Sequence, residues 1–415
     1  MHINQSPEIT VLFMACELYV HQEKTAELTH FLEKNPIDWE LLYQLADRHR
    51  LKPFLYKALQ KSAGCPKRFL TSLQNDCREA ATDNLLKLHH YHSVDKLLTE
   101  NHIDHIALKG IYLAENCYPD TSLRSTGDID LLIYKEDVFR TTNLFQQYGY
   151  QLNKKHAVHW QNKRETVLSD LFEVSLFKPF FGSNAFEIDL HWYILGFNIY
   201  YKLFDLSFIR SNPALVNERN IILLVAHHGV FNVWQRIYYI NDLYFLLKNK
   251  PVHWETLLKE LDSVGFKQVF LSGLYWCHTI WGLVLPPQIE SLIKSEKVRS
   301  MASRYAESWK ESQTDEKSYL IVKQFSLFFR AQSHFLGKLN VLGSFIKSRL
   351  FRYSLFKVGK KYIYFPKELG FITVFVRVFQ SILRFFPDRS NPSGAERNSD
   401  NDPQLASRES SQSAR

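Results

Sequence analysis

The sequence predicts an α+β protein, in which a mixed sheet with helices is flanked by helical regions toward both ends of the chain. Residues 8–98 and 218–282 place apolar side chains at helical spacing, with short breaks. Between them, residues 102–108, 128–134 and 150–192 are predicted as strands separated by Pro, Gly and Asn turns. Strands confined to one part of a mainly helical chain are typical of the α+β class.

The same pattern predicts the shorter elements and the segment boundaries. A helix at 113–117 opens near Gly110, and a helix at 137–148 ends at Gly149, which suits a helix C-cap. The tail is rich in Ser, Asn, Asp, Arg and Gln and has almost no large apolar residue, so we expect it to be disordered. We therefore expect a helical N-terminal region (1–98), a mixed core (99–195), a helical domain (196–310), a basic, aromatic-rich helical region (311–386) and a disordered tail (387–415).

Composition is typical of a globular protein in a reducing compartment. The 415 residues are 45% apolar, enough for a sizeable core. Five scattered cysteines with no Cys-x-x-Cys spacing argue against a disulfide framework and against a structural zinc site. We find no secretory signal, no apolar run long enough to span a membrane and no DNA-binding motif. We expect the protein to be cytoplasmic or, as an alternative, to be bound peripherally at the inner membrane surface.

The net charge of +8, from 51 basic and 43 acidic residues, is unevenly distributed. Residues 338–384 contain ten basic residues and one acidic residue, Glu368. A basic, aromatic-rich segment suits an anionic partner such as a membrane surface, RNA or a polysaccharide phosphate. The alternative is a solvated basic face on helices that pack against the body. Residues 369–386 are predicted as a helix with a wide apolar face and a narrow basic stripe, which fits either an interfacial membrane helix or a docked helix.

Two carboxylates two residues apart, Asp128 and Asp130, lie in the second predicted strand. Because side chains alternate along a strand, both point to the same face and can hold divalent metal ions. Glu187, Asp189 and His191 share one face of a later strand for the same reason. Asp189 or Glu187 would supply a third carboxylate and complete a magnesium site for phosphoryl or nucleotidyl transfer. Glu187 otherwise supports the ligands or faces solvent, and His191 either bonds a ligating carboxylate or is a core histidine.

A longer ordered set of motifs surrounds these residues: Ile106–Gly110, Tyr118–Asp120, Arg124, Asp128–Leu132, Gly149–Tyr150, Ile188–Trp192, His227, His228, Trp234 and Asp242. On these residues the chain resembles the bacterial family of uncharacterised nucleotidyltransferases, a branch of the DNA polymerase β-like superfamily, over roughly residues 35–290. The resemblance implies a polymerase β-like core and an NTP substrate. It also implies two Mg²⁺ ions, with Asp128 and Asp130 as paired ligands and Asp189 as the third.

The resemblance implies nucleotide-binding residues as well. Lys109-Gly110 stands where many polymerase β-like enzymes have Gly-Ser. The glycine permits close approach of a phosphate to a helix start, and Lys109 would neutralise that phosphate. Arg124 either contacts the triphosphate or braces the two aspartates, while Ser125 either binds the nucleotide or caps a turn. Asp242 is a further candidate for the cleft, as a residue that supports the site.

His227 and His228 fall in a predicted helix. Adjacent helical residues diverge by about 100°, so the two imidazoles cannot both face one metal ion. Trp234 is expected in the core, where large aromatic residues on helices usually lie.

Three functions fit these motifs. The first is a Mg²⁺-dependent nucleotidyltransferase that moves an NMP from an NTP to a hydroxyl of a small molecule, a glycan precursor or a protein. The second is a toxin-like nucleotidyltransferase that modifies RNA, because Leu108–Gly110 and Arg124–Asp130 are also similar to such toxins. The third is a non-catalytic scaffold that kept the fold. The intact Asp128, Asp130 and Asp189 argue against the scaffold, and we expect the first function.

Overall fold

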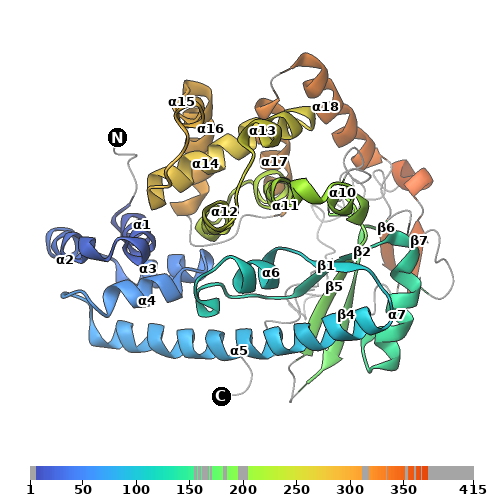
Figure 1. Cartoon of the computed structure of the whole chain (residues 1–415), viewed down its shortest axis with the longest axis horizontal. Helices are drawn as coiled ribbons and strands as arrows, with labels where there is room; N and C mark the ends of the chain where they lie inside the picture. Colours follow the sequence, from blue (N-terminus) through green and yellow to red (C-terminus); the bar gives the residue numbers. More distant parts are fainter. Residues whose placement is uncertain are drawn as a thin grey trace, which may run out of the picture.

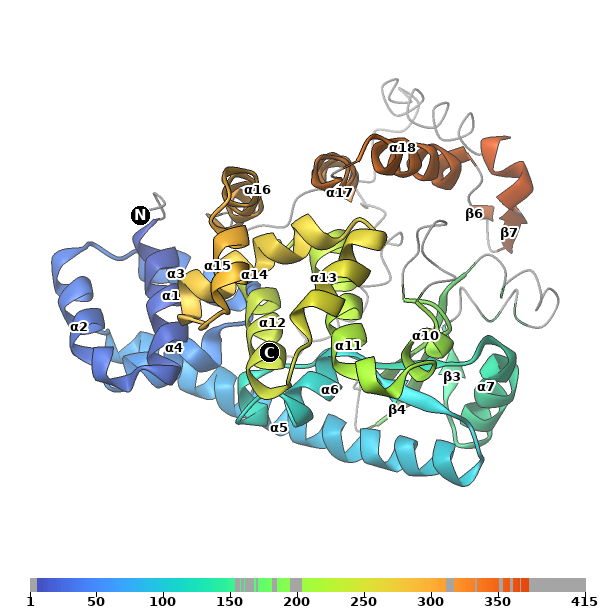
Figure 2. The same ribbon diagram turned by 45° about the horizontal axis from the view of Figure 1, so that its top comes forward.

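The computed structural model describes residues 6–153, 171–180, 185–194, 204–310, 317–332, 334–350, 354–358, 361–365 and 367–372, together with Ala157, Trp160 and Leu168. A long helix, α5 (Lys67–Glu100), runs along one side of the molecule from the N-terminal helices to a small sheet (Figure 1). In both views, α11 (Val216–Leu224), α12 (Ile237–Asn249) and α14 (Lys267–Trp281) lie on the opposite side of α6 (Lys109–Asn116) from α5 (Figures 1 and 2).

Five short strands form the sheet, in the order β1-β2-β5-β4-β3. β2 and β5 are parallel, and the other neighbouring pairs are antiparallel. The predicted α+β class with a mixed sheet is therefore confirmed. The strands are β1 (His105–Ala107), β2 (Ile129–Ile133), β3 (Gln151–Leu152), β4 (Glu173–Pro179) and β5 (Ala185–His191).

The two faces of this sheet differ, because β2, β4 and β5 alternate apolar and polar side chains. One face buries Ile129, Leu131 and Ile188 against Val94 of α5 and Phe145 of α7 (Val138–Gln147). The opposite face of the sheet carries the carboxylates described below. A buried apolar face thus fixes the register that places the acidic side chains together.

The N-terminal helices and the later helices share a second, larger core, although they are far apart in sequence. Phe54 of α4, for example, lies against Phe245 of α12 and Trp281 of α14. The helices outside the sheet region are α1 (Pro7–Val20), α2 (Thr25–Lys34), α3 (Trp39–Arg48), α4 (Lys52–Leu59), α6 (Lys109–Asn116), α10 (Leu206–Arg210), α11 (Val216–Leu224), the π-helix η6 (Val225–Phe231), α12 (Ile237–Asn249), α13 (Trp254–Ser263), α14 (Lys267–Trp281), α15 (Pro287–Ile293), α16 (Glu296–Ala306), α17 (Lys317–Ala331) and α18 (Phe335–Leu350).

Local sequence signals explain several helix ends. Asp38 accepts a hydrogen bond from the Leu41 amide at 3.0 Å and caps α3, and Asp205 caps α10 through the Phe208 amide. Gly149, predicted to end its helix, has φ +87° directly after α7. Short 3₁₀ helices cover Gln22–Lys24, Thr121–Leu123, Lys135–Asp137, Pro213–Leu215, Glu307–Lys310 and Lys367–Leu369.

Trp234 is fully buried, as predicted. The Trp234 indole packs directly against the backbone of Gly229 and Gly273. A Cβ atom on either glycine would lie within 3.0 Å of the Trp234 ring. Both glycines are therefore required for this packing.

The C-terminal region differs from the prediction in one respect. Besides the helices α17 and α18, the region expected to be helical at 311–386 contains an antiparallel hairpin, β6 (Ser354–Val358) and β7 (Lys361–Phe365), which the sequence did not predict. The run Tyr362–Phe365 consists of aromatic and β-branched residues, which favour strands. Of the helix predicted at 369–386, only the part up to Ile372 is described, and the predicted disordered tail lies outside the described residues.

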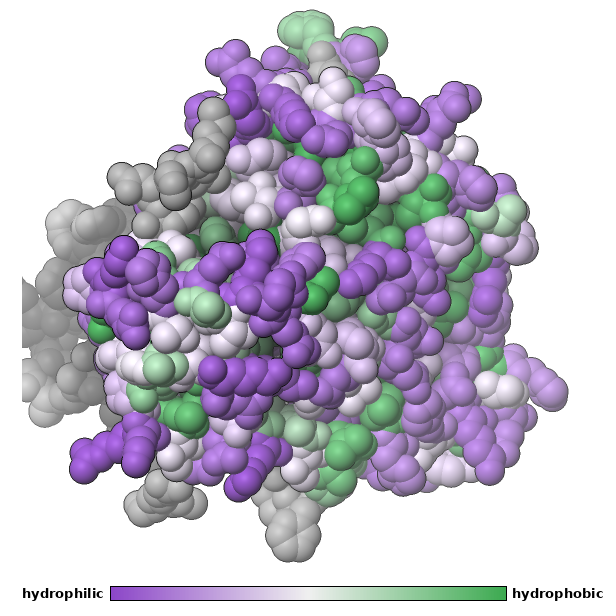
Figure 3. Space-filling view, turned by 60° about the vertical axis from the view of Figure 1, so that its left-hand side comes forward, coloured by the Kyte–Doolittle hydropathy of each residue, from purple (hydrophilic) through white to green (hydrophobic). Residues whose placement is uncertain are grey.

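Within the described part of the chain, no helix combines the length and the apolar character needed to cross a bilayer. Seen from the side of the N-terminal helices, the surface is mostly hydrophilic, and hydrophobic residues gather in separate small patches (Figure 3).

Candidate active site

The centre of the candidate site is a pair of aspartates on adjacent parallel strands. Asp130 of β2 is in register with Asp189 of β5, so both side chains lie on the polar face of the sheet. Oxygens of Asp130 and Asp189 and a ring nitrogen of His191 lie within 4.8 Å of one another. One oxygen of Asp189, Oδ1, is buried and has no hydrogen-bond partner among the described residues. A buried carboxylate oxygen without a donor is an available ligand for a cation.

Lys109 and His191 both contact Asp130. Its Oδ1 lies 2.9 Å from Nζ of Lys109 and 2.9 Å from Nε2 of His191. Burial opposes the charged form of Asp130, but the charge of Lys109 and the hydrogen bond from His191 outweigh burial, and the pKa of Asp130 falls to about 2. Asp130 is therefore ionised throughout the physiological range.

The pKa values of the other carboxyl groups on this face are raised, in contrast to that of Asp130. Burial, followed by the charge of Asp130, raises the pKa of Asp189 well above its usual range. Burial and the charges of Asp128 and Asp130 raise the pKa of Glu187 to about 7. Burial also raises the pKa of Glu173, whose Oε2 lies 3.1 Å from Nδ1 of His191. This crowding of buried carboxyl groups, whose ionisation a bound cation would favour, fits a divalent cation with hard oxygen ligands, as does the unpaired Asp189 oxygen.

Asp128 lies directly before β2 and is half-buried. It stands outside the close group of Asp130, Asp189 and His191, but its charge raises the pKa of Asp189 and of Glu187. The three aspartates predicted from the sequence therefore lie in one acidic region, with Asp128 at its edge.

Two residues of α5 hold the loop that leads into β2. The buried Asn84 donates from Nδ2 to the carbonyls of Thr121 and Arg124, at 3.0 and 2.9 Å, and its Oδ1 accepts from the amide of Thr126 at 3.0 Å. Nζ of Lys87 donates to the Thr126 carbonyl at 2.8 Å. These bonds fix the backbone two residues before Asp128.

Lys109 adopts an unusual backbone conformation at the first residue of α6. Its φ is +31°, a value that costs a residue with a side chain of order 1–3 kcal/mol. The following Gly110 is buried, and a Cβ atom there would lie 3.7 Å from Cγ2 of Thr126. The strained backbone directs the Lys109 side chain to Asp130 and, at 3.0 Å, to Nε2 of His227.

His227 and His228 extend this set of contacts into the π-helix η6. Nδ1 of His227 lies 2.9 Å from Nδ1 of His228, and Nε2 of His228 lies 2.8 Å from Oδ2 of Asp242. Burial lowers the pKa of both histidines, that of His228 to about 4, so both rings are neutral. Lys109 can only donate, so each proton is assigned: His227 donates from Nδ1 to His228, and His228 donates from Nε2 to Asp242. His227 thus contacts Lys109 and His228 contacts Asp242, while the two imidazoles also contact each other.

Arg124 makes a contact that the sequence did not predict. Its guanidinium is buried and pairs with Asp242, with Nε at 2.7 Å from Oδ1 and Nη2 at 3.0 Å from Oδ2. Tyr118 donates to the same carboxylate at 2.7 Å. Arg124 therefore braces Asp242 of α12, and within the described chain its side chain forms no ion pair with Asp128 or Asp130. Ser125 contributes its carbonyl, which accepts from Arg124.

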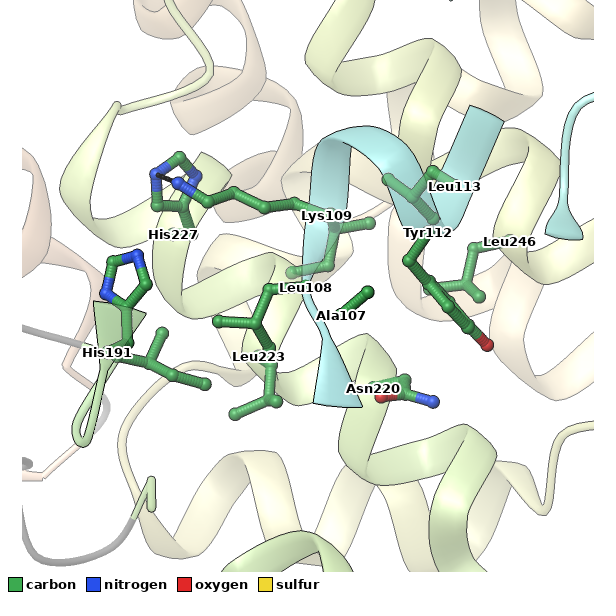
Figure 4. Close-up of a pocket in the computed structure, with 12 residues that line it drawn as sticks. Ala107, Leu108, Lys109, Tyr112, Leu113, His191, Asn220, Leu223, His227 and Leu246 are labelled. Atoms are coloured by element: carbon green, nitrogen blue, oxygen red, sulfur yellow. Dashed lines mark hydrogen bonds between the residues drawn. The ribbon is translucent and has the colours of Figure 1, made fainter. Parts of the chain in front are cut away.

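A cavity of about 40 Å³ lies beside Lys109 and His191. Lys109, His191 and His227 gather at one end of it, whereas Tyr112, Asn220 and Leu246 lie at the other (Figure 4). The cavity is thus polar next to the carboxylates and mainly apolar away from them.

Sequence reasoning missed three contributors to this site. Glu173 of β4 is in register with His191 of β5. The alternation of Glu173 and Ser175 with Val174 and Leu176 could have predicted that Glu173 lies on the polar face of the sheet. Asn84 and the contact between Lys109 and His227 carried no local signal, because both depend on helices that meet only in the folded chain.

The family comparison agrees with this geometry. The model of the family described as Uncharacterised nucleotidyltransferase matches residues 35–282, which is more than half of the chain. The chain belongs to this nucleotidyltransferase family. The match confirms the resemblance and is consistent with the polymerase β-like core. The search of curated proteins and the search of solved structures gave no match.

Proposed function

We propose that this nucleotidyltransferase is Mg²⁺-dependent and moves an NMP from an NTP to a hydroxyl of a small molecule, a glycan precursor or a protein side chain. The observation that supports this proposal is the in-register pair of Asp130 and Asp189 on parallel strands, with an unpaired Asp189 oxygen and Asp128 close by. A sheet face with this surplus of buried carboxylates is costly unless a cation or a substrate uses it.

Asp128, Asp130 and Asp189 would hold the metal. Bound Mg²⁺ supplies charge neutralisation at phosphate oxygens and lowers the pKa of an attacking hydroxyl. His191 orients Asp130 through the bond from its Nε2, as imidazoles beside ligating carboxylates commonly do.

The other residues of the site act on the nucleotide and on the acceptor. Lys109 places a positive charge at the start of α6, where free amide groups also favour an anion, and therefore binds a phosphate. Asp189 orients the acceptor hydroxyl and helps to deprotonate it.

The test is calorimetric binding of each of the four NTPs in Mg²⁺ and in EDTA. We expect one NTP to bind in Mg²⁺ only, and Asp130→Asn and Asp189→Asn to lose that binding while they keep the fold. Asp262→Asn, a partly exposed carboxylate of α13, is the matched control and should bind as the wild type does. Metal-independent binding, or equal binding by the Asp130 and Asp189 variants, would refute the proposal.

A further inference from the structure

One face of α18 exposes a row of apolar side chains to solvent. Phe335 is 74% exposed and Leu336 is 72% exposed, far more than is usual for such residues. The opposite face of α18 packs on the protein: Val341 is buried, and the ring of Phe345 lies 4.3 Å from that of Phe325 on α17. The exposed row, here called the α18 stripe, consists of Phe335, Leu336, Leu339, Leu342 and Ile346.

The spacing of these residues makes the stripe continuous. Phe335, Leu339, Leu342 and Ile346 follow one another at intervals of four, three and four residues, which aligns them along one side of an α-helix. At about 100° per residue, Lys338 falls at one edge of the stripe and Lys347 at the other.

Along the sequence, the charged residues of α18 and of the segment that follows it have a single sign. Residues 335–365 contain no acidic residue and seven basic residues: Lys338, Lys347, Arg349, Arg352, Lys357, Lys360 and Lys361. An apolar stripe with lysines at both edges is the pattern of a helix that lies in a membrane interface, where long cationic side chains reach the lipid headgroups.

We propose that the α18 stripe binds the surface of an anionic lipid bilayer, with the helix parallel to the membrane plane. The apolar side chains enter the acyl boundary, and the lysines at the edges pair with lipid phosphates. RNA would use the positive charge, but it offers no partner for a row of leucine and isoleucine side chains, since single strands are bound by charge and by stacking on aromatic rings. The proposal is independent of the catalytic proposal above, because it uses none of the same residues.

The test is co-sedimentation of the full-length protein with vesicles. We expect binding to phosphatidylcholine vesicles that contain about one quarter phosphatidylglycerol, weaker binding to phosphatidylcholine alone, and loss of binding at high salt. Leu339→Ser/Ile346→Ser should weaken binding about tenfold or more, and Lys338→Gln/Lys347→Gln should weaken it mainly on the anionic vesicles.

The matched control is Leu85→Ser, which removes a leucine that is 61% exposed on α5 and should bind vesicles as the wild type does. Circular dichroism confirms that each variant is folded. Three results would overturn the proposal: no vesicle binding by the wild type, equal binding by the stripe variant, or a dimer in light scattering that the stripe variant abolishes. Retention of RNA in place of vesicles, unchanged by the stripe variant, would also overturn it.

Discussion

The ammonium group of Lys109 lies 2.9 Å from Oδ1 of Asp130 and 3.0 Å from Nε2 of His227. It is therefore shared between a buried carboxylate and a neutral imidazole. The carboxylate binds it by charge, whereas the imidazole offers only a lone pair. This arrangement balances the charge of Asp130, and it keeps the positive charge at the start of α6, where a phosphate would bind.

Replacement of Lys109 by Met should have opposite effects on metal and on nucleotide. Without the ammonium group, the acidic cluster loses its internal counter-ion, so Mg²⁺ should bind more tightly and raise the melting temperature more than it does in the wild type. NTP affinity should fall about tenfold or more, because a phosphate loses its cation. Thermal melting with MgCl₂ alone and calorimetry with NTP measure the two effects.

Lys259→Met, on the exposed side of α13, is the control for loss of one positive charge and should change neither quantity. Weaker stabilisation by Mg²⁺ in Lys109→Met would contradict the role of Lys109 as a counter-ion that competes with metal.

Replacement of His227 should act through Lys109. In His227→Leu the ammonium group loses one of its two partners, and we expect the KM for NTP to rise about tenfold with a smaller change in kcat. In His227→Gln the amide oxygen can accept from Lys109, so the KM should return toward the wild-type value. Steady-state kinetics of both variants check this, and equal losses in both would show that His227 matters only for packing.

The sequence predicted the strands of the sheet and the carboxylates that share its polar face. Alternation of side chains along a strand puts Asp128 on the same face as Asp130, and it puts Asp189 on the same face as Glu187 and His191. It could not show that Asp130 and Asp189 are directly in register, since pairing between strands depends on the whole sheet. The sequence also could not predict that Arg124 pairs with Asp242. Arg124 and Asp242 are 118 residues apart, and they meet because α12 packs over the loop before β2. Long-range pairs of this kind leave no local pattern.

Arg124 should matter for stability more than for nucleotide binding. Arg124→Met leaves the buried Asp242 without its main counter-charge, and loss of one partner of a buried pair typically costs about 3–5 kcal/mol. We expect a loss of that order in the free energy of unfolding, measured by urea denaturation. A double variant, Arg124→Met/Asp242→Leu, should lose less than the sum of the single variants. A loss of NTP binding at unchanged stability would instead support the role that the sequence predicted for Arg124.

His49 should make folding stability depend on pH. It is fully buried between α3 and the helical domain, where its Nε2 donates to the Trp309 carbonyl at 2.9 Å and its Nδ1 accepts from the Ile237 amide at 3.1 Å. Burial lowers the pKa of His49 to about 3, below its ordinary value of 6.5. The unfolded chain therefore takes up a proton first, so this contribution to stability is complete above pH 6.5 and is lost as the pH falls toward 3.

The expected loss at pH 5 is about 2 kcal/mol from His49 alone, from 1.4 kcal/mol for each pH unit below 6.5. Urea denaturation at pH 7.5 and pH 5 measures the fall, and His49→Gln isolates its source. The variant should be less stable at pH 7.5, because glutamine fits the site poorly, but its stability should fall by about 2 kcal/mol less between the two pH values. An equal fall in both proteins would assign the acid sensitivity to the buried histidines of the active site instead.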